Sequence, residues 1–126
     1  MKHPERIEDY LEHISVAIDR AASYVQQVPS LAAFQKNPQV QDAVIRNIEI
    51  IGEAASKIQQ QAPDFVKQHP ELPWIEMRSV RNKMIHNYFD VELPVVWGTV
   101  KDDLPKLKQQ IDHLLIDLKR EPDRSR

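Results

Sequence analysis

An arginine and a histidine lie close together in the run Arg81-Asn82-Lys83-Met84-Ile85-His86-Asn87-Tyr88, and these two side-chain types can act together on a phosphodiester. A guanidinium can donate two parallel hydrogen bonds to a phosphate, and an imidazole transfers protons near neutral pH. RNA cleavage needs both functions, because the 2′-hydroxyl attacks the neighbouring phosphorus while the 5′-oxygen leaves. We therefore expect Arg81 to hold the scissile phosphate and His86 to serve as the acid or the base.

The segment from Pro73 to Phe89 is predicted to form one helix that carries this run. Its apolar arc, at about 100° per residue, consists of Met77, Val80, Met84, Ile85 and Tyr88. Arg81 falls in the middle of that arc, although a guanidinium is costly to bury without a partner. His86 lies about 140° from Arg81 around the same ideal helix. Either the helix unwinds near His86, or a second chain completes the site.

Polar residues around Arg81 are candidate partners and substrate contacts. The preceding helix carries Glu49 and Glu53, which either belong to an ion-pair ladder on their own helix or reach across to Arg81. Arg78 and Asn82 form a polar stripe with the histidine at spacings of four. Asn82 orients the imidazole, contacts ribose or simply faces solvent. Arg78 is a phosphate guide or an ordinary surface charge.

The spacing Arg-x4-His-x-Tyr resembles the motif of HepT-type toxins, which belong to the HEPN superfamily of metal-free ribonucleases. The resemblance also covers flanking segments, in the order and at the spacings of that family: Ile50-Ile51-Gly52-Glu53-Ala54, Leu72-Pro73-Trp74, Arg81-Asn82, His86-Asn87-Tyr88, Trp97 and Leu104-Pro105. It extends from the first helix to about residue 118. We therefore expect one HEPN-like domain over residues 1–118 and a polar, disordered tail over residues 119–126.

The resemblance has implications for partners. It implies a homodimer, alone or within a larger hetero-oligomer, in which two motif helices border one cleft. The implied substrate that this cleft binds for cleavage is mRNA or tRNA. It also implies an antitoxin of the MntA type, a minimal nucleotidyltransferase that transfers AMP to Tyr88. An attached AMP would place a bulky anion beside Arg81, where substrate phosphate would otherwise bind.

Composition limits the remaining possibilities. The chain has 126 residues, of which 29% are charged and 41% hydrophobic, which suits a single soluble domain. It has no cysteine, no apolar run long enough to cross a bilayer and no signal-like apolar start, which fits the cytoplasm. A net charge of −2 argues against non-specific coating of nucleic acid. The scattered histidines form no metal-binding motif and no Gly-rich phosphate loop is present, so we expect neither a metal nor a cofactor.

Hydrophobic periodicity and turn residues predict an all-α bundle of four to six helices. The first helix is expected from Pro4 to about Gln27, followed by a short turn that Ser30 caps. The second long helix is expected from Asn37, as N-cap, to about Gln61. Gly52 lies in its middle, and it indicates close contact with another helix rather than a direct role in chemistry. The expected C-terminal part is a short helix or loop over 63–70, a helical stretch over 95–103, and a last helix to residue 118 that Pro105 either opens or kinks.

A second interpretation has no catalysis. The bundle would dimerise and bind a nucleotidyltransferase, and Arg81 would form only a salt bridge. Toxicity on expression that is lost in His86→Ala separates the two.

Overall fold

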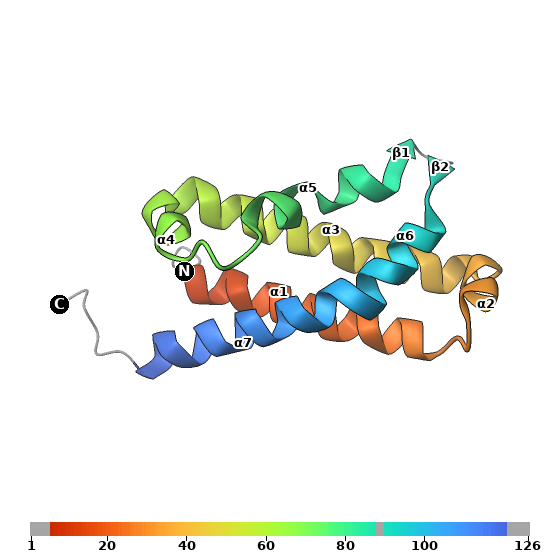
Figure 1. Ribbon diagram of the computed structural model, residues 1–126, viewed down its shortest axis with the longest axis horizontal. Helices are drawn as coiled ribbons and strands as arrows, with labels where there is room; N and C mark the ends of the chain where they lie inside the picture. Colours follow the sequence, from red (N-terminus) through yellow and green to blue (C-terminus); the bar gives the residue numbers. More distant parts are fainter. Residues whose placement is uncertain (1–5, 88–89, 121–126) are drawn as a thin grey trace, which may run out of the picture.

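The computed structural model describes residues 6–87 and 90–120, except for the side chain of residue 87. These residues form a bundle of long helices with one short hairpin, so the predicted all-α class is confirmed (Figure 1). The elements in chain order are α1 (Ile7–Gln26), α2 (Leu31–Gln35), α3 (Pro38–Gln61), α4 (Pro63–Gln68), α5 (Trp74–Met84), β1 (Ile85–Asn87), β2 (Asp90–Val91), α6 (Leu93–Gly98), the π-helical turn η1 (Thr99–Asp103) and α7 (Leu104–Arg120).

Capping residues set the helix starts that the sequence predicts. The Ser30 hydroxyl accepts a hydrogen bond from the backbone N–H of Ala33 at 3.1 Å, which opens α2. The Asn37 side chain accepts from the N–H of Val40 at 3.1 Å, and Pro38 occupies the first position of α3. The expected start at Pro4 lies outside the described residues. α7 continues to Arg120, so it includes the first two residues of the predicted tail, and the remaining residues 121–126 lie outside the described part.

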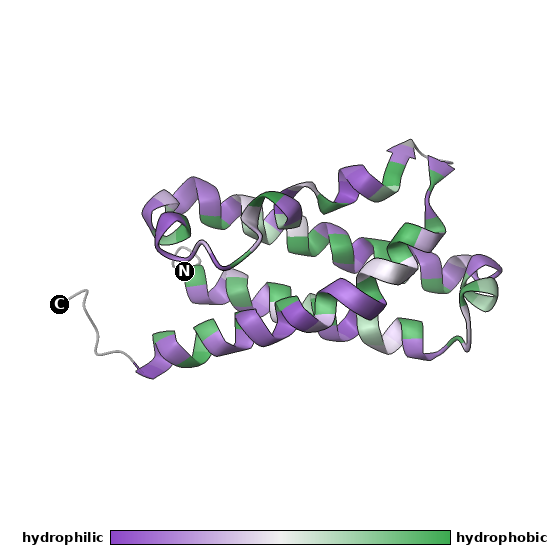
Figure 2. Ribbon diagram, in the orientation of Figure 1, coloured by the Kyte–Doolittle hydropathy of each residue, from purple (hydrophilic) through white to green (hydrophobic). Residues whose placement is uncertain are grey.

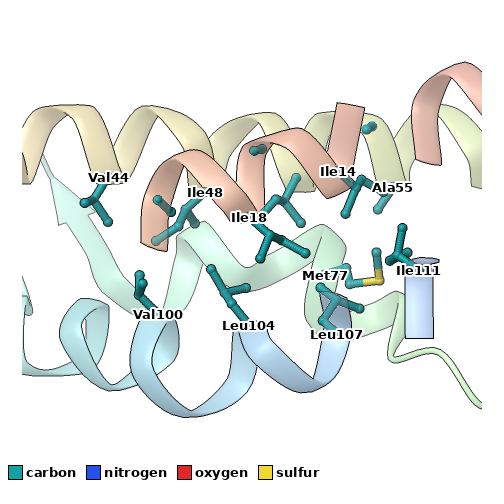
Figure 3. Packing of buried hydrophobic residues seen from close by; sticks show 14 of the residues in the cluster. Ile14, Ile18, Val44, Ile48, Ala55, Met77, Val100, Leu104, Leu107 and Ile111 are labelled. Atoms are coloured by element: carbon teal, nitrogen blue, oxygen red, sulfur yellow. The ribbon is translucent and has the colours of Figure 1, made fainter. Parts of the chain in front are cut away.

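The core lies between α1, α3 and α7, with α5 packed along α3 (Figure 1). Each long helix alternates hydrophilic and hydrophobic segments along its length (Figure 2). Side chains from α1, α3, α5, η1 and α7 converge in Figure 3, among them Ile14, Ile18, Ile48, Met77, Val100, Leu104 and Leu107. Full burial of each large apolar side chain contributes about 1.5–3 kcal/mol, so this packing is what fixes α5 on the bundle. None of the described helices is long and apolar enough to cross a bilayer.

A polar cluster joins α1 to α7 beside the core. The Ser15 hydroxyl donates to Asp112 Oδ1 at 2.8 Å and accepts from Lys108 Nζ at 2.6 Å. Lys108 also pairs with Asp19 at 3.0 Å. Burial opposes the charge of Lys108, but its hydrogen bonds to Asp19 and Asp112 outweigh that effect and raise its pKa. The cluster fixes how α7 is placed along α1.

Gly52 lies at a close approach between α3 and α5. A Cβ atom on residue 52 would lie 3.3 Å from the carbonyl oxygen of Met77 and 3.5 Å from that of Arg78. Both contacts are to backbone of α5, which cannot rotate away. The predicted role of Gly52 in close helix contact is therefore confirmed, and its lack of a side chain sets the spacing of the two helices.

The helix predicted from Pro73 to Phe89 ends earlier, at Met84. Ile85 is extended, with φ −120° and ψ 109°, and it pairs with Val91 across the β1–β2 hairpin. The carbonyl of Met84 accepts a hydrogen bond from the backbone N–H of Glu92 at 2.8 Å. The prediction was wrong because this longer-range bond replaces a continuing helix, which a periodic apolar pattern cannot reveal.

The last helical run combines α6, η1 and α7. The residues that join these elements, Gly98, Thr99 and Leu104, all have right-handed helical backbone angles. Counted as one helix, this run brings the described chain to six helices, in agreement with the prediction. Pro105 lacks an N–H and its ring would clash with the carbonyl four residues earlier. The wider π turn lies directly before Pro105, so the helix accommodates it without a break.

Alanine at the two glycines should separate close packing from helix propensity. Gly98 has helical angles and no atom within 4 Å of an added Cβ, so Gly98→Ala should raise the free energy of unfolding by about 1 kcal/mol. Gly52→Ala should fall short of that gain by about 1 kcal/mol or more, because its methyl group presses on α5. Urea denaturation of both variants measures the difference. An equal gain at both positions would show that Gly52 does not limit the spacing.

Candidate active site

A polar cavity of about 470 Å³ lies where α3 and α5 run side by side. Three basic and two acidic side chains line it, so its charge is close to balanced. The lining residues are Glu49, Gly52, Glu53, Ser56, Lys57, Arg78, Arg81 and Asn82. The cavity therefore gathers five of the residues singled out from the sequence: Glu49, Glu53, Arg78, Arg81 and Asn82.

Arg81 lies in the last turn of α5 and faces α3. Its Nε donates a hydrogen bond to Glu49 Oε2 at 2.9 Å. The side chain of Arg81 is 52% exposed and that of Glu49 is 29% exposed. The expectation that Arg81 is buried is therefore wrong for the single chain. Arg81 lies at the margin of the apolar arc, where α5 borders the polar face of α3, rather than over the core.

The expected pairing of Arg81 with α3 is confirmed for Glu49 and not for Glu53. Glu53 instead lies 3.6 Å from Arg46 on its own helix, as in the ion-pair ladder that the sequence also allowed. Both interpretations of the acidic residues therefore apply, one to each glutamate. An exposed pair contributes at most about 1 kcal/mol to stability, so the effect of Glu49 is mainly on the direction of the guanidinium.

Arg78 and Asn82 line the cavity beside Arg81, and both are exposed. Arg78 Nη1 donates to the side-chain oxygen of Gln59 at 3.0 Å, which holds it along α3. The predicted stripe through Arg78, Asn82 and His86 is not formed, because α5 ends at Met84. His86 therefore points in a direction that the hairpin sets, and it is not among the residues that line the cavity.

His86 lies on β1, two residues beyond the end of α5, and its Nε2 is 2.7 Å from Glu92 Oε2. This hydrogen bond is the largest cause of the raised pKa of His86; desolvation opposes the increase, and the negative charges of Glu92 and Asp90 add to it. The imidazole is 47% exposed and open to a substrate. Of the two possibilities raised by the sequence, the helix does unwind before His86. Tyr88, the predicted site of AMP transfer, lies outside the described residues.

Glu92 is the partner of His86 that the sequence analysis missed. Six positions separate it from His86, a spacing that would place the two about 120° apart around a continuous helix at about 100° per residue. The two side chains meet only because the chain folds back through β1 and β2. Leu93-Pro94 after Glu92 was an available signal, since proline at the start of a helix marks a new element there.

Metal binding has little support in the described part of the chain. No three histidine, aspartate or glutamate side chains there lie close enough together to hold an ion. The chemistry that these residues can perform is proton transfer by His86 and phosphate binding by Arg81.

Comparison with known proteins identifies the family. The profile described as "Ribonuclease HepT-like" matches residues 14–114. A protein of Thermococcus cleftensis named "Probable ribonuclease HepT" is 43% identical over 106 residues, which cover 84% of this chain and 93% of that protein. A candidate RNase from Caldanaerobacter subterraneus is 34% identical over 106 residues, 84% of this chain and 91% of the relative. No solved structure gives a significant match. The chain therefore belongs to the HepT-like ribonuclease family, as the Arg-x4-His-x-Tyr spacing indicates.

Proposed function

We propose that this protein is the RNA-cleaving toxin of a type VII toxin–antitoxin pair of the HepT–MntA kind, and that it acts without a metal. The observation that carries the proposal is the arrangement of Arg81 and His86. Both side chains are half-exposed at the same end of α5. One nitrogen of Arg81 is hydrogen-bonded to the Glu49 carboxylate, and one nitrogen of His86 is hydrogen-bonded to the Glu92 carboxylate. Membership of the HepT-like ribonuclease family and the names of the relatives support the proposed activity.

Arg81 is proposed to bind the scissile phosphate. The bond to Glu49 uses Nε alone. A guanidinium also carries N–H donors on its two terminal nitrogens, so Glu49 orients the group and leaves these donors for phosphate oxygens. Charge on those oxygens grows as the 2′-oxygen bonds to phosphorus, and a preoriented cation stabilises it.

His86 is proposed to transfer a proton during the same reaction. The 2′-hydroxyl loses its proton to a base as its oxygen attacks phosphorus, and the bond from phosphorus to the 5′-oxygen breaks as an acid protonates the leaving oxygen. The products carry a 2′,3′-cyclic phosphate or its hydrolysed form. One imidazole in its charged form serves as the acid, and a second in its neutral form serves as the base. All steps use proton transfers and one fixed cation, without a metal ion.

A homodimer is proposed because one chain supplies one imidazole at this site. A twofold axis beside α5 would bring two copies of Arg81 and His86 to a single cleft, with an acid and a base from the same residue type. The half-exposed state of both side chains leaves room for such a partner. A purified protein that is monomeric by analytical ultracentrifugation at micromolar concentration, and still cuts RNA, would contradict this arrangement.

Tyr88 is proposed as the site where an MntA-like nucleotidyltransferase attaches AMP. It follows His86 by two positions in the sequence, as in the Arg-x4-His-x-Tyr motif. The phosphate of the AMP would compete with RNA for Arg81, and its bulk would block the cleft. The target RNA is mRNA or tRNA.

The alternative of a non-catalytic module rests on the bond between Arg81 and Glu49, since a structural salt bridge needs no substrate. Both interpretations have the same transferase partner. They differ in whether expression of the chain is toxic and whether His86→Ala removes that toxicity.

Removal of either proposed catalytic side chain should abolish RNA cleavage. Arg81→Ala removes the phosphate-binding cation and His86→Ala removes the proton-transfer group, so each should reduce the cleavage rate by at least about 100-fold. The assay measures the cleavage of total RNA by purified protein in the presence of EDTA. Lys83→Ala is the matched control, because it removes an exposed cation from the same turn of α5 but not from the cavity. Full activity of either Arg81→Ala or His86→Ala would refute its proposed role.

Tyr88→Phe should leave RNA cleavage intact but escape the antitoxin. Phenylalanine keeps the ring and removes the oxygen that would accept AMP. Co-expression with the cognate transferase should rescue growth of cells that make the wild-type protein and not of cells that make Tyr88→Phe. Mass spectrometry of the purified proteins should show added AMP on the wild type alone. Rescue of both, with AMP on neither, would exclude Tyr88 as the switch.

A further inference from the structure

Glu92 is held in place by its backbone, independently of its side chain. Its N–H donates to the carbonyl of Met84 at 2.8 Å, and its own carbonyl accepts from Val95 at 3.0 Å and Val96 at 3.1 Å. These bonds tie the residue to the end of α5 on one side and to the start of α6 on the other. The carboxylate is therefore presented to β1 from a fixed point, and it reaches His86 Nε2 at 2.7 Å.

We propose that Glu92 is a positioning residue for the proton transfers of His86, and that it directs Nδ1 of the imidazole toward RNA; this proposal rests on the function proposed above. Within the described part of the chain, the carboxylate is hydrogen-bonded to Nε2, so Nδ1 is the ring nitrogen available to exchange a proton with RNA. Neutral His86 keeps its hydrogen on Nε2, where it is donated to Glu92, and presents a lone pair at Nδ1. Charged His86 presents a proton at Nδ1 instead.

The charges around His86 favour its protonated form. Glu92 and, more weakly, Asp90 raise the pKa of the imidazole. Both carboxylates come from the return segment of the hairpin, while the adjoining turn of α5 supplies the cations Arg81 and Lys83. Arg81 is engaged by Glu49. The imidazole that protonates the leaving 5′-oxygen must be charged before the reaction, and Glu92 maintains that charge toward higher pH.

Glu92→Gln removes the charge and leaves the backbone bonds. The pKa of His86 should fall, because the carboxylate no longer stabilises the imidazolium. The alkaline limb of the pH–rate profile for RNA cleavage should move to lower pH, in the same direction. Cleavage at neutral pH should decrease roughly tenfold or more, as part of the about 10²–10⁴-fold that acid–base catalysis contributes. Glu92→Asp keeps the charge and should retain more of the activity than Glu92→Gln.

The readout that does not need activity is NMR of protein with ¹⁵N-labelled histidine. The wild type should show the neutral tautomer of His86 with hydrogen on Nε2, and Glu92→Gln should lower its titration midpoint. Glu71→Gln is the matched control, because it removes a carboxylate 3.2 Å from His69 in a similar exposed pair. It should leave the titration of His86 and the cleavage of RNA unchanged.

The two measurements distinguish the possible failures. If Glu92→Gln changes neither the titration of His86 nor the pH–rate profile, the proposal is overturned. It is also overturned if the titration moves while the cleavage profile stays in place, since Glu92 then has no role in the reaction. If the wild-type protein cuts no RNA, the proposed function fails, and the positioning role fails with it even where NMR shows that the pair exists.

Discussion

The carbonyl oxygens of Met77 and Arg78 would lie 3.3 Å and 3.5 Å from a Cβ atom on residue 52, and this close backbone contact underlies the geometry of the site. α3 and α5 run antiparallel to each other past this contact (Figure 1). One turn before Gly52 on α3 is Glu49, and one turn after Arg78 on α5 is Arg81. The two side chains therefore meet at 2.9 Å as a consequence of the backbone contact. A larger residue at position 52 would move the guanidinium away from the carboxylate that orients it.

The end of α5 is the second constraint, and it is independent of the first. The chain leaves the helix after Met84, and the bond from Glu92 to the Met84 carbonyl closes the hairpin. His86 therefore does not follow the helical spacing from Arg81, and the hydrogen bond to Glu92 orients its imidazole instead. Arg81 and His86 therefore belong to two different elements, α5 and β1, so their relative position depends on the junction after Met84 rather than on helix periodicity.

The sequence predicted those features that depend on local chemistry. Ser30 and Asn37 cap helices through their own side chains, and Gly52 in mid-helix indicated a close neighbour. The sequence could not predict the end of α5. Ile85 continues the apolar periodicity of the helix, and the hydrogen bond that ends the helix is donated by the backbone N–H of Glu92. The sequence also could not show that Arg81 pairs with Glu49 rather than with Glu53. Both lie on one face of α3, and only the placement of α5 along α3 selects between them.

Two carboxylates beside the proposed RNA-cleaving site raise an electrostatic question, because they would repel the phosphate that Arg81 is proposed to bind. The cavity is nearly balanced in charge and the chain is negative, so ground-state binding of RNA gains little from long-range attraction. The two carboxylates instead reduce the conformational freedom of the Arg81 guanidinium and the His86 imidazole. In the proposed mechanism, a guanidinium held at Nε would meet the growing charge on the phosphoryl oxygens without reorganisation, and an imidazole held at Nε2 would already be aligned for proton transfer. Interactions that strengthen in the transition state raise the rate, whereas tight binding of the substrate alone does not. An acidic protein with two carboxylate-held side chains is therefore consistent with an RNA-cleaving enzyme.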